Sequence, residues 1–439
     1  MRSPMRLPKT DELAVTTLGS CRSPSPLGES ETLFVDDSAR VLVSPDLEDV
    51  TPFLQSGAPP PSFERAGPRS KIFFDPASIH CGIVTCGGLC PGLNDVIRSI
   101  VLILSGHYRV KGILGFRYGY AGLGPNPPRE PMKLDPKTVE RIHQWGGTML
   151  GSSRGPQKPA DMVDSLVRHK ISVLFTIGGD GTLRGASAIV EEIRRRQLPI
   201  SVVGIPKTID NDLRWTERTF GYVTAVEAAR KAVDGAHEEA RAHINGVGIV
   251  KLMGRESGFI AAGATLASAD VNFCLVPEFP FSVDGDTGFL KTLEQRLDAW
   301  RHAVVVIAEG AGQDLVQRSA GSEQDASGNA RLEDVGPHLR DTIKEYFTRI
   351  KKPVSIKYID PSYTIRSLPA NALDSAFCLI LGHHAAHAGM AGRTDVMIGR
   401  WNGRFVHVPI ALGVSSRKKL DPTLWQRVLE ATGQPASMR

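Results

Sequence analysis

The sequence predicts an α/β protein made of two doubly wound α/β lobes, preceded by an N-terminal extension. Strand-like apolar runs alternate with stretches of helical apolar spacing, and glycine turns follow several of the strands. The alternation begins at Cys81 and starts again at Asp270, which indicates two α/β tracts. Ligands of such sheets bind at the carboxyl ends of the strands, so we expect the active site in the cleft between the lobes.

The elements of the first tract follow from apolar spacing. Short apolar runs bounded by glycine or proline predict strands, whereas apolar residues three and four positions apart predict helices. Strands are expected at residues 81–88, 110–116, 171–182 and 199–208, of which the first and third run into glycine turns. Helices are expected at residues 93–104, 137–145 and 186–196.

The second tract repeats the alternation and ends in a long helix and two strands. Residues 311–336 are polar and glycine-rich, which predicts an exposed loop or hairpin. No repeat of domain length is present, so the lobes are not predicted to be copies of each other. Strands are expected at residues 269–278, 302–310, 353–360, 395–401 and 404–410, and helices at residues 288–300 and 372–392.

The domain boundaries follow from shifts in composition. Residues 1–70 are rich in loops and proline, which predicts an extension that is partly disordered. Its Ser/Pro-rich start lacks the apolar core of a signal peptide and carries early acidic residues, so a disordered leader is favoured over an organelle import signal. We place the first lobe at residues 71–215 and the second at residues 216–439, with the C-terminal segment returning to the first lobe.

The charge balance is mildly basic. The formal net charge of +5 results from 52 basic and 47 acidic residues without a basic run. This balance favours small anionic ligands and predicts no nucleic-acid partner. No apolar run reaches the roughly 18 residues that span a bilayer, so no membrane partner is expected either.

The six cysteines predict reduced, buried thiols. Cys86 and Cys90 are separated by three residues and no second pair lies near them, which argues against both a zinc site and a disulfide framework. Reduced thiols favour a cytoplasmic location, with a plastid or another organelle as the alternative. His383, His384 and His387 share a helical stretch without an acidic ligand at a suitable spacing, so packing is favoured over metal binding.

Two glycine turns carry features of phosphate chemistry. In "TCGGLCPGLND" (85–95), the glycines between a strand and a helix suit either a phosphate cradle or close helix–sheet packing. In "TIGGDGTLRG" (176–185), Asp180 follows the strand directly, where a carboxylate can hold Mg²⁺ beside a nucleotide phosphate. The alternative role of Asp180 is to cap the following helix. The Gly-Gly-Asp-Gly motif is shared by several classes of kinase, including NAD kinases and diacylglycerol kinases.

The stretch "VVGIPKTIDNDL" (202–213) places two carboxylates close to the glycine turns. Asp210 and Asp212 allow one carboxylate to accept a hydroxyl proton while the other remains electrostatic. Thr208 offers a hydroxyl and Lys207 a point charge to a phosphoryl group. The alternative is an Asx-turn that only starts a helix.

Further polar residues lie in loops along the chain. Taken singly, the basic ones are typical of surface ion-pair partners. Together they supply the dispersed cations that bind a sugar phosphate, and Glu309 at a strand end suits sugar hydroxyls. They are Arg154, Arg255, Lys357, Tyr363 and Arg366.

Six motifs together resemble the 6-phosphofructokinase family. They are "TCGGLCPGLNDVIR", "IGGDGTLRGA", "GIPKTIDND", "KLMGRESGFIA", "AEGAGQ" and "KYIDPSYTIRS", in the family's order from about Lys71 to Pro409. The sequence is most similar to the ATP-dependent type of plants and trypanosomatids, which is related to the pyrophosphate-dependent enzymes. The resemblance implies the phosphofructokinase fold and an allosteric, glycolytic enzyme that forms a homotetramer or at least a dimer.

The resemblance also implies transfer of a phosphoryl group to the 1-hydroxyl of fructose 6-phosphate with Mg²⁺ as cofactor. It makes Asp210 the base and Asp212 a supporting carboxylate near Mg²⁺. Asp180 becomes the metal-linked aspartate. Thr208 contacts the transferred phosphoryl group, and Arg154 helps to stabilise the transition state.

The same resemblance assigns two sets of binding residues, and with them a nucleotide role for the first lobe and a sugar-phosphate role for the second. The nucleotide set is Gly88, Arg154, Gly179, Asp180, Gly181 and Thr182. The fructose 6-phosphate set is Thr208, Asp210, Met253, Gly254, Arg255, Glu309, Lys357, Tyr363 and Arg366.

Two residues bear on the phosphoryl donor, and they point in opposite directions. Gly181 has no side chain and leaves room for the rest of ATP, where pyrophosphate users carry an aspartate. Lys207 instead matches the lysine of pyrophosphate users. Because a blocked pocket excludes ATP outright, whereas an added cation only tunes affinity, the sequence favours ATP over pyrophosphate.

Two other functions remain as alternatives. An NAD or lipid kinase would explain the Gly-Gly-Asp-Gly turn but leaves "PKTIDND" and "MGRESG" without a role. A catalytically inert regulatory subunit would be expected to lack Asp180 or Asp210, and both are present.

Overall fold

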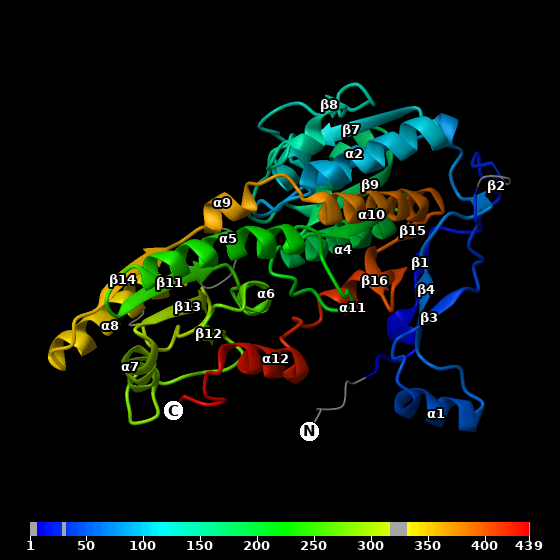
Figure 1. Cartoon of the computed structure of the whole chain (residues 1–439). Coiled ribbons are helices and arrows are strands. Elements are labelled where there is room, and N and C mark those ends of the chain that lie inside the picture. The colour runs from blue at the N-terminus through cyan, green and yellow to red at the C-terminus, as the bar shows by residue number, and fades with distance from the viewer. Residues whose placement is uncertain (1–6, 29–31, 317–331, 439) are drawn as a thin grey trace. The chain divides into compact units, whose positions relative to one another are not determined.

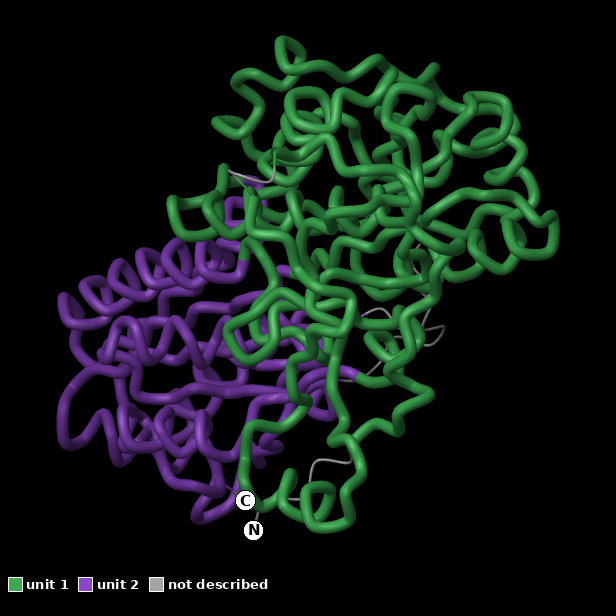
Figure 2. The backbone as a smooth tube through the Cα atoms, turned by 90° about the vertical axis from the view of Figure 1, so that its right-hand side faces the viewer, with its two compact units in different colours: residues 1–208, 213–221, 368–416 green, residues 209–212, 222–367, 417–439 purple. Residues whose placement is uncertain are grey.

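The computed structural model describes residues 7–28, 32–316 and 332–438. The elements are labelled in Figure 1, and Figure 2 colours the two compact units into which the chain divides. Unit 1 comprises Met1–Thr208, Leu213–Gly221 and Leu368–Ser416, and unit 2 comprises Ile209–Asp212, Tyr222–Ser367 and Arg417–Arg439. These limits differ from the predicted boundaries at residues 70 and 215, because the N-terminal residues cluster with unit 1 and the chain passes between the units several times.

Unit 1 is built on a nine-stranded sheet in the order β3-β4-β17-β16-β10-β9-β6-β7-β8. Strands β16, β10, β9, β6 and β7 are parallel to one another, and antiparallel strands flank them on both sides. The parallel strands are β6 (His80–Thr85), β7 (Gly112–Phe116), β9 (Ile171–Gly178), β10 (Ser201–Pro206) and β16 (Val396–Trp401). The flanking strands are β3 (Arg40–Leu42), β4 (Ser62–Arg65), β17 (Arg404–Pro409) and β8 (Met132–Lys133).

Helices cover both faces of this sheet, and alternate residues of β9 show how. Leu174 packs in the same apolar cluster as side chains of α3 (Pro159–Arg168) and α4 (Asp180–Arg195). Val173 and Phe175 point the other way and lie against Gly389 of α10 (Ala372–Met390). This alternation is why the strand is continuously apolar. The remaining helices of unit 1 are α1 (Leu47–Ser56), α2 (Leu93–Ile103) and α11 (Ile410–Gly413).

The N-terminal segment adds strands to unit 1 where the sequence predicted partial disorder. Besides β3 and β4, β1 (Thr16–Thr17) pairs with β15 (Arg393–Thr394), and β2 (Ser23–Pro24) pairs with β5 (Lys71–Ile72). Residues 1–6 and 29–31 of the predicted extension lie outside the described residues.

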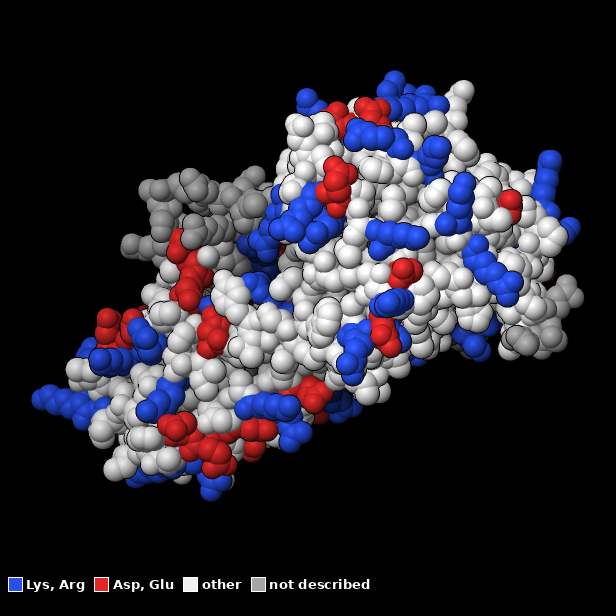
Figure 3. Space-filling view, turned by 90° about the horizontal axis from the view of Figure 1, so that it is seen from above, with Lys and Arg blue, Asp and Glu red and all other residues white. Residues whose placement is uncertain are grey.

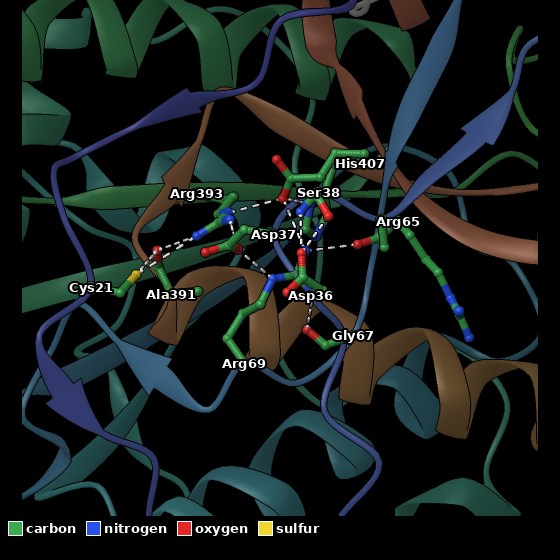
Figure 4. A network of polar contacts seen from close by, with 12 residues as sticks. Cys21, Asp36, Asp37, Ser38, Arg65, Gly67, Arg69, Ala391, Arg393 and His407 are labelled. Carbon is green, nitrogen blue, oxygen red and sulfur yellow. Dashed lines mark hydrogen bonds and ion pairs between the residues drawn. The ribbon is translucent and has the colours of Figure 1, made fainter.

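An ionic network that is buried except at Asp37 ties this segment to the strands β15 and β17 (Figure 4). The Arg393 guanidinium contacts Glu64 at 3.0 Å and Asp37 at 2.6 Å, and Arg69 contacts the same two carboxylates. His407 Nδ1 lies 2.9 Å from Glu64 Oε1. Despite burial, the His407 contact and the two guanidinium groups lower the pKa of Glu64 to about 2.

Unit 2 is built on a four-stranded parallel sheet in the order β12-β13-β11-β14. Alternate residues of β11 again enter different clusters: Val250 and Leu252 pack with α5, α6 and α12, whereas Val247 and Ile249 pack with α7 and α8. The strands are β11 (Gly246–Leu252), β12 (Phe273–Leu275), β13 (His302–Ala308) and β14 (Ser355–Ile359). The helices are α5 (Tyr222–Arg241), α6 (Phe259–Ser268), α7 (Phe289–Trp300), α8 (Val335–Arg349), α9 (Ser362–Arg366) and α12 (Pro422–Thr432).

One predicted helix is wrong. Residues 137–145 form turns and a single 3₁₀ turn at Ile142–Gln144. Asp135 Oδ1 accepts hydrogen bonds from both the backbone N–H and the hydroxyl of Thr138, as a helix N-cap does, but the chain leaves the helical path after one turn. The predicted loop 311–336 lies largely outside the described residues, which resume at residue 332.

The surface carries charges of both signs, and the cysteines are not paired in disulfides. Figure 3 shows Lys and Arg side chains interspersed with Asp and Glu on the face that it draws. Among the described residues, no helix combines the length and apolarity needed to cross a membrane. All six cysteines are free thiols, and five of them are buried, in line with the prediction.

Candidate active site

The glycine turn after β6 is held by the segment that follows Leu150 in unit 1. Gly87 N donates to Ser153 O at 3.1 Å, and Ser152 Oγ donates to Gly87 O at 2.6 Å. These bonds satisfy both backbone polar groups of Gly87, which lies outside any helix or strand. The predicted phosphate turn and the "LGSSRGP" loop are therefore one local structure.

Two cations lie at this turn. Lys207 Nζ donates to Gly88 O at 2.8 Å, and a Cβ added at Gly88 would lie 3.6 Å from Arg154 Nη2. Lys207 is buried, whereas Arg154 is exposed. The structure thus brings together three of the residues predicted to bind phosphate or to bear on the donor, within unit 1.

The second glycine turn opens helix α4, and its glycines have different roles. A Cβ at Gly178 would lie 2.2 Å from Thr182 Oγ1, so packing alone requires glycine there. A Cβ at Gly181 would meet no heavy atom within 4 Å. Neither close packing nor a left-handed backbone requires glycine at this position. The fold itself would therefore accommodate a side chain at residue 181.

Asp180 is the first residue of α4 and stands after the N-cap residue Gly179. Gly179 has no side chain with which to cap the helix, and Asp180 Oδ2 lies 3.2 Å from Arg184 Nε one turn along the helix. A carboxylate at a helix N-terminus is favoured by the helix dipole. Thr182 is buried, and its carbonyl accepts a hydrogen bond from Tyr120 Oη at 2.7 Å.

The segment Ile209–Asp212 belongs to unit 2 and carries the two predicted aspartates. Asn211 between them has φ of 55°, a left-handed conformation that asparagine tolerates better than most residues. Asp212 Oδ2 accepts a hydrogen bond from Arg417 Nη1 at 3.0 Å, and Asp212 O accepts one from Lys418 N at 2.8 Å. Lys418 Nζ reaches Asn211 Oδ1 at 3.1 Å.

The carboxyl group of Asp210 has a strongly raised pKa. Burial, followed by the negative charges of Asp212 and Glu309, raises its pKa to about 8. The backbone N–H of Arg255 and the charge of Arg417 oppose this rise. A carboxyl group whose pKa lies near neutrality suits proton transfer at physiological pH.

Glu309 is one of the charges that act on Asp210. It lies just beyond β13, where hydrogen bonds connect the ends of β11 and β13. Glu309 N donates to Leu252 O at 2.9 Å, and Gly310 N donates to Gly254 O at 3.1 Å. Gly254 has φ of 136°, which favours glycine at this point. Burial raises the pKa of Glu309, and the charge of Arg255 is the largest opposing influence. Met253, between the strand end and Gly254, is buried.

The remaining predicted substrate residues divide into two groups. Tyr363 and Arg366 both lie on the short helix α9 after β14, with the Arg366 guanidinium 4.2 Å from the centre of the Tyr363 ring. Lys357 does not join them: it is exposed, pairs in register with Gly248 in the middle of β11, and lies 3.8 Å from Glu239 of α5. Residues that bind ligands in such sheets stand at the strand ends, and Lys357 stands short of that edge.

The structure adds residues that sequence reasoning missed. Arg417 and Lys418 contact the aspartate segment from far along the chain, and Ser257 Oγ lies 3.3 Å from Asp210 O. The basic stretch "SRKKL" was the only signal for the first two, and a short basic run more often marks a solvated surface.

Two of the three histidines of α10, His384 and His387, pack as predicted. His387 is buried and its Nδ1 lies 2.8 Å from Tyr108 Oη, and His384 stacks on Phe405 with ring centres 4.6 Å apart. Among the described residues, no group of three or more His, Cys, Asp or Glu side chains is arranged to hold a metal ion.

A glycine turn with two cations in one unit, and a buried carboxyl group of raised pKa in the other, are features of enzymes that transfer phosphoryl groups. Known proteins identify the family of this chain. The family model described as phosphofructokinase matches residues 80–389. The chain belongs to the phosphofructokinase family.

Relatives with curated names are similar in sequence to this chain over 85–97% of its length. The ATP-dependent 6-phosphofructokinase of Amycolatopsis methanolica is 49% identical, covering 97% of this chain and 95% of that protein. The enzyme of the same name from Trypanosoma brucei brucei is 45% identical, covering 96% and 87%. ATP-dependent 6-phosphofructokinase 7 of Arabidopsis thaliana is 48% identical, covering 85% and 77%.

Solved structures share the fold at lower identity. The pyrophosphate-dependent phosphofructokinase of Marinobacter aquaeolei matches with a TM-score of 0.65 at 20% identity, covering 78% of this chain and 86% of that chain. The phosphofructokinase of Pichia pastoris matches with a TM-score of 0.62 at 21% identity, covering 81% and 37%. The predicted phosphofructokinase fold is confirmed.

Proposed function

We propose that this chain is an ATP-dependent 6-phosphofructokinase, which transfers the γ-phosphoryl group of ATP to the 1-hydroxyl of fructose 6-phosphate. The observation that carries the chemistry is Asp210, a buried carboxyl group whose pKa is raised to about 8 by burial and by Asp212 and Glu309. The names of relatives with 45–49% identity support the choice of substrates and donor.

In this proposal Asp210 is the general base. It accepts the proton of the 1-hydroxyl as the oxygen attacks the phosphoryl group. The backbone N–H of Arg255 orients its carboxyl group. Asp212 is fixed by Arg417 at 3.0 Å and acts as a supporting charge. Thr208 supplies a hydroxyl to the transferred group.

The phosphate side of the reaction uses the turn of unit 1. Arg154 and Lys207 lie at Gly88 and supply positive charge to nucleotide phosphates. Because Arg154 is exposed, its side chain has room to move toward the transferred group and to stabilise the negative charge that develops there. Gly179, Gly181 and Thr182 complete the proposed nucleotide set at the start of α4.

Asp180 would hold Mg²⁺, the cofactor that we propose. Mg²⁺ is bound by one or two carboxylates and otherwise by phosphate oxygens and water, so one carboxylate at the start of α4 fits its needs. When bound, Mg²⁺ neutralises charge on the phosphates of the donor.

Fructose 6-phosphate would be bound by residues of unit 2 at the strand ends. Arg255 and Arg366 supply cations for its phosphate, and Glu309 accepts hydrogen bonds from its hydroxyls. Met253, Gly254 and Tyr363 complete this set. Lys357 remains a weaker member, because it lies in the middle of its strand.

A comparison of donors tests the proposal. Turnover of fructose 6-phosphate is measured with Mg²⁺ and either ATP or pyrophosphate at equal concentration. We expect turnover with ATP. Turnover with pyrophosphate but not with ATP would show that pyrophosphate is the donor. Binding of the sugar phosphate without turnover with either donor would favour the inert regulatory subunit.

Three further features belong to this proposal. The enzyme is a homo-oligomer, tetramer or dimer, which light scattering of the purified protein checks. It works in glycolysis in the cytoplasm, with a plastid or another organelle as the alternative, and fractionation of the source cells distinguishes these. An NAD or lipid kinase is disfavoured because Asp210, Arg255 and Glu309 would have no role in it.

A further inference from the structure

Lys251 is a buried cation near the carboxyl end of the apolar strand β11. All seven residues of this strand are buried, and Lys251 is its only ionisable side chain. A buried ammonium group is stable only when carboxylates compensate for the loss of water. The family resemblance assigns no role to Lys251, although this residue stands two positions before Met253.

Two carboxylates from different elements compensate this charge. Lys251 Nζ lies 2.8 Å from Asp360 Oδ2 and 2.9 Å from Asp334 Oδ1. The register explains the first contact: Val250 pairs with Ile359 across β11 and β14, so the next residues are Lys251 and Asp360. Asp334 arrives as the N-cap of α8 and also accepts a hydrogen bond from Gly336 N.

Asp360 in turn fixes the start of α9. Its Oδ1 accepts hydrogen bonds from the backbone N–H of Ser362 at 3.0 Å and from the Ser362 hydroxyl. With one oxygen on Lys251 and the other on Ser362, the carboxylate cannot rotate without breaking a bond. The next residue is Tyr363, and Arg366 lies on the same short helix.

Lys251 also acts on Glu309 through its charge. After burial and Arg255, Lys251 is the next influence on that carboxyl group, and it favours the ionised form. Glu309 follows β13 directly, and the last residues of that strand pair with Lys251 and Leu252. One buried cation therefore faces both strand ends that carry the proposed sugar-phosphate residues.

We propose that Lys251 is a positioning residue for the sugar-phosphate site, which orients Tyr363 and Arg366 through Asp360. This inference rests on the proposed function, because it takes those residues as ligands of fructose 6-phosphate. Lys251 does not touch the substrate in this role. Its loss weakens substrate binding by releasing the turn at residues 360–362.

The test is steady-state kinetics on Lys251→Met, Asp360→Asn and the double variant, with each substrate varied in turn. We expect KM for fructose 6-phosphate to rise about tenfold or more in each single variant, because small displacements of binding groups are costly. KM for ATP should change less than about twofold. The double variant should be no worse than Lys251→Met alone, since both changes break the same link.

Lys291→Met is the matched control. It removes another lysine of unit 2 that pairs with a carboxylate, Glu294 at 2.8 Å, on helix α7. Its kinetics should equal those of the wild type. Should Lys251→Met fail to fold, Asp360→Asn makes the same test, because it breaks the link and leaves the ammonium paired with Asp334.

The outcomes separate this inference from the proposed function. Binding of fructose 6-phosphate to the wild type is measured by calorimetry, and its phosphorylation by turnover. If the wild type shows neither, the proposed function itself is wrong. If the wild type is active and a folded variant keeps its KM for fructose 6-phosphate, only the role of Lys251 is overturned. Equal rises in both KM values, or effects that multiply in the double variant, overturn it too.

Discussion

Lys207 Nζ donates a hydrogen bond to the carbonyl oxygen of Gly88 at 2.8 Å, across 119 positions of sequence. Lys207 follows β10 and Gly88 follows β6, and both strands pair with β9 between them. The parallel sheet thus brings the lysine to the glycine turn. Its charge and its hydrogen bond are two separate contributions: the first attracts phosphate and the second holds the turn.

Replacement of Lys207 should therefore affect the nucleotide side of the reaction. In Lys207→Met we expect KM for ATP to rise about tenfold, because one buried cation is lost from the turn, while KM for fructose 6-phosphate stays within about twofold. The melting temperature should fall by a few degrees, since the Gly88 carbonyl loses its donor. Steady-state kinetics and thermal unfolding measure both effects.

Lys111→Met provides the control, because Lys111 is exposed at the amino-terminal end of β7. A folded Lys207→Met protein with unchanged KM for ATP would restrict Lys207 to a structural role.

Substitutions of Gly181 test the choice of donor without disturbing the fold. A Cβ at this position meets no heavy atom within 4 Å, so Gly181→Ala and Gly181→Asp should both fold with melting temperatures close to the wild type. Gly181→Asp adds a negative charge where the donor phosphates are proposed to lie, and we expect kcat/KM for ATP to fall about a hundredfold or more. Gly181→Ala should lose much less.

The comparison uses ATP and pyrophosphate as donors for all three proteins. Retention of ATP use by Gly181→Asp would show that this position does not set the choice of donor.

The variant Asp210→Asn should separate catalysis from substrate binding. Loss of the base should lower kcat by about 10³-fold, with fructose 6-phosphate binding largely kept, because asparagine retains the shape and cannot accept the proton. Turnover and direct calorimetric titration with fructose 6-phosphate measure the two properties. A fall in kcat of less than tenfold would exclude Asp210 as the base.

The same variant should be more stable than the wild type at alkaline pH. Folding raises the pKa of Asp210 from its ordinary value of 3.8 to about 8. The wild type therefore loses stability progressively as pH rises from about 4 to 8, because the folded protein holds a proton that the unfolded chain releases. Melting temperatures between pH 5 and pH 9 should show Asp210→Asn gaining on the wild type as pH increases. A constant difference would contradict the raised pKa.

The sequence was informative where function depends on local motifs. The glycine turns, Asp180 and the Asp210–Asp212 segment were all found from residue type and spacing within a few positions. Strand β9 and helix α4 were predicted because apolar runs and helical spacing are strong local signals. The family resemblance then connected motifs that spacing alone left apart.

Contacts between distant segments were not predictable. Arg417 meets Asp212 across 205 positions, and Lys251 meets Asp360 only because β11 and β14 are neighbours in register. The N-terminal segment was expected to be partly disordered because proline and short apolar runs give no strand signal. Its strands are stabilised by pairing with β17 and β15, which composition does not reveal.

Glu64 should show how strongly the N-terminal segment contributes to unit 1. In Glu64→Gln the guanidinium groups of Arg69 and Arg393 lose a buried carboxylate that now lies 3.1 and 3.0 Å from them. Breaking one member of a buried ionic network costs about 3–5 kcal/mol of unfolding free energy. Urea unfolding near pH 7 measures this loss, and Glu48→Gln on the exposed face of α1 is the control.

The loss should depend on pH in a defined direction. The pKa of Glu64 is lowered from 4.5 to about 2 in the folded protein, so its contribution is complete above about pH 4.5 and disappears as pH falls toward 2. The difference between wild type and Glu64→Gln should therefore narrow across this range, which melting temperatures at pH 3, 4 and 6 measure. A difference that stays constant down to pH 3 would mean that Glu64 is not held ionised by Arg69, Arg393 and His407.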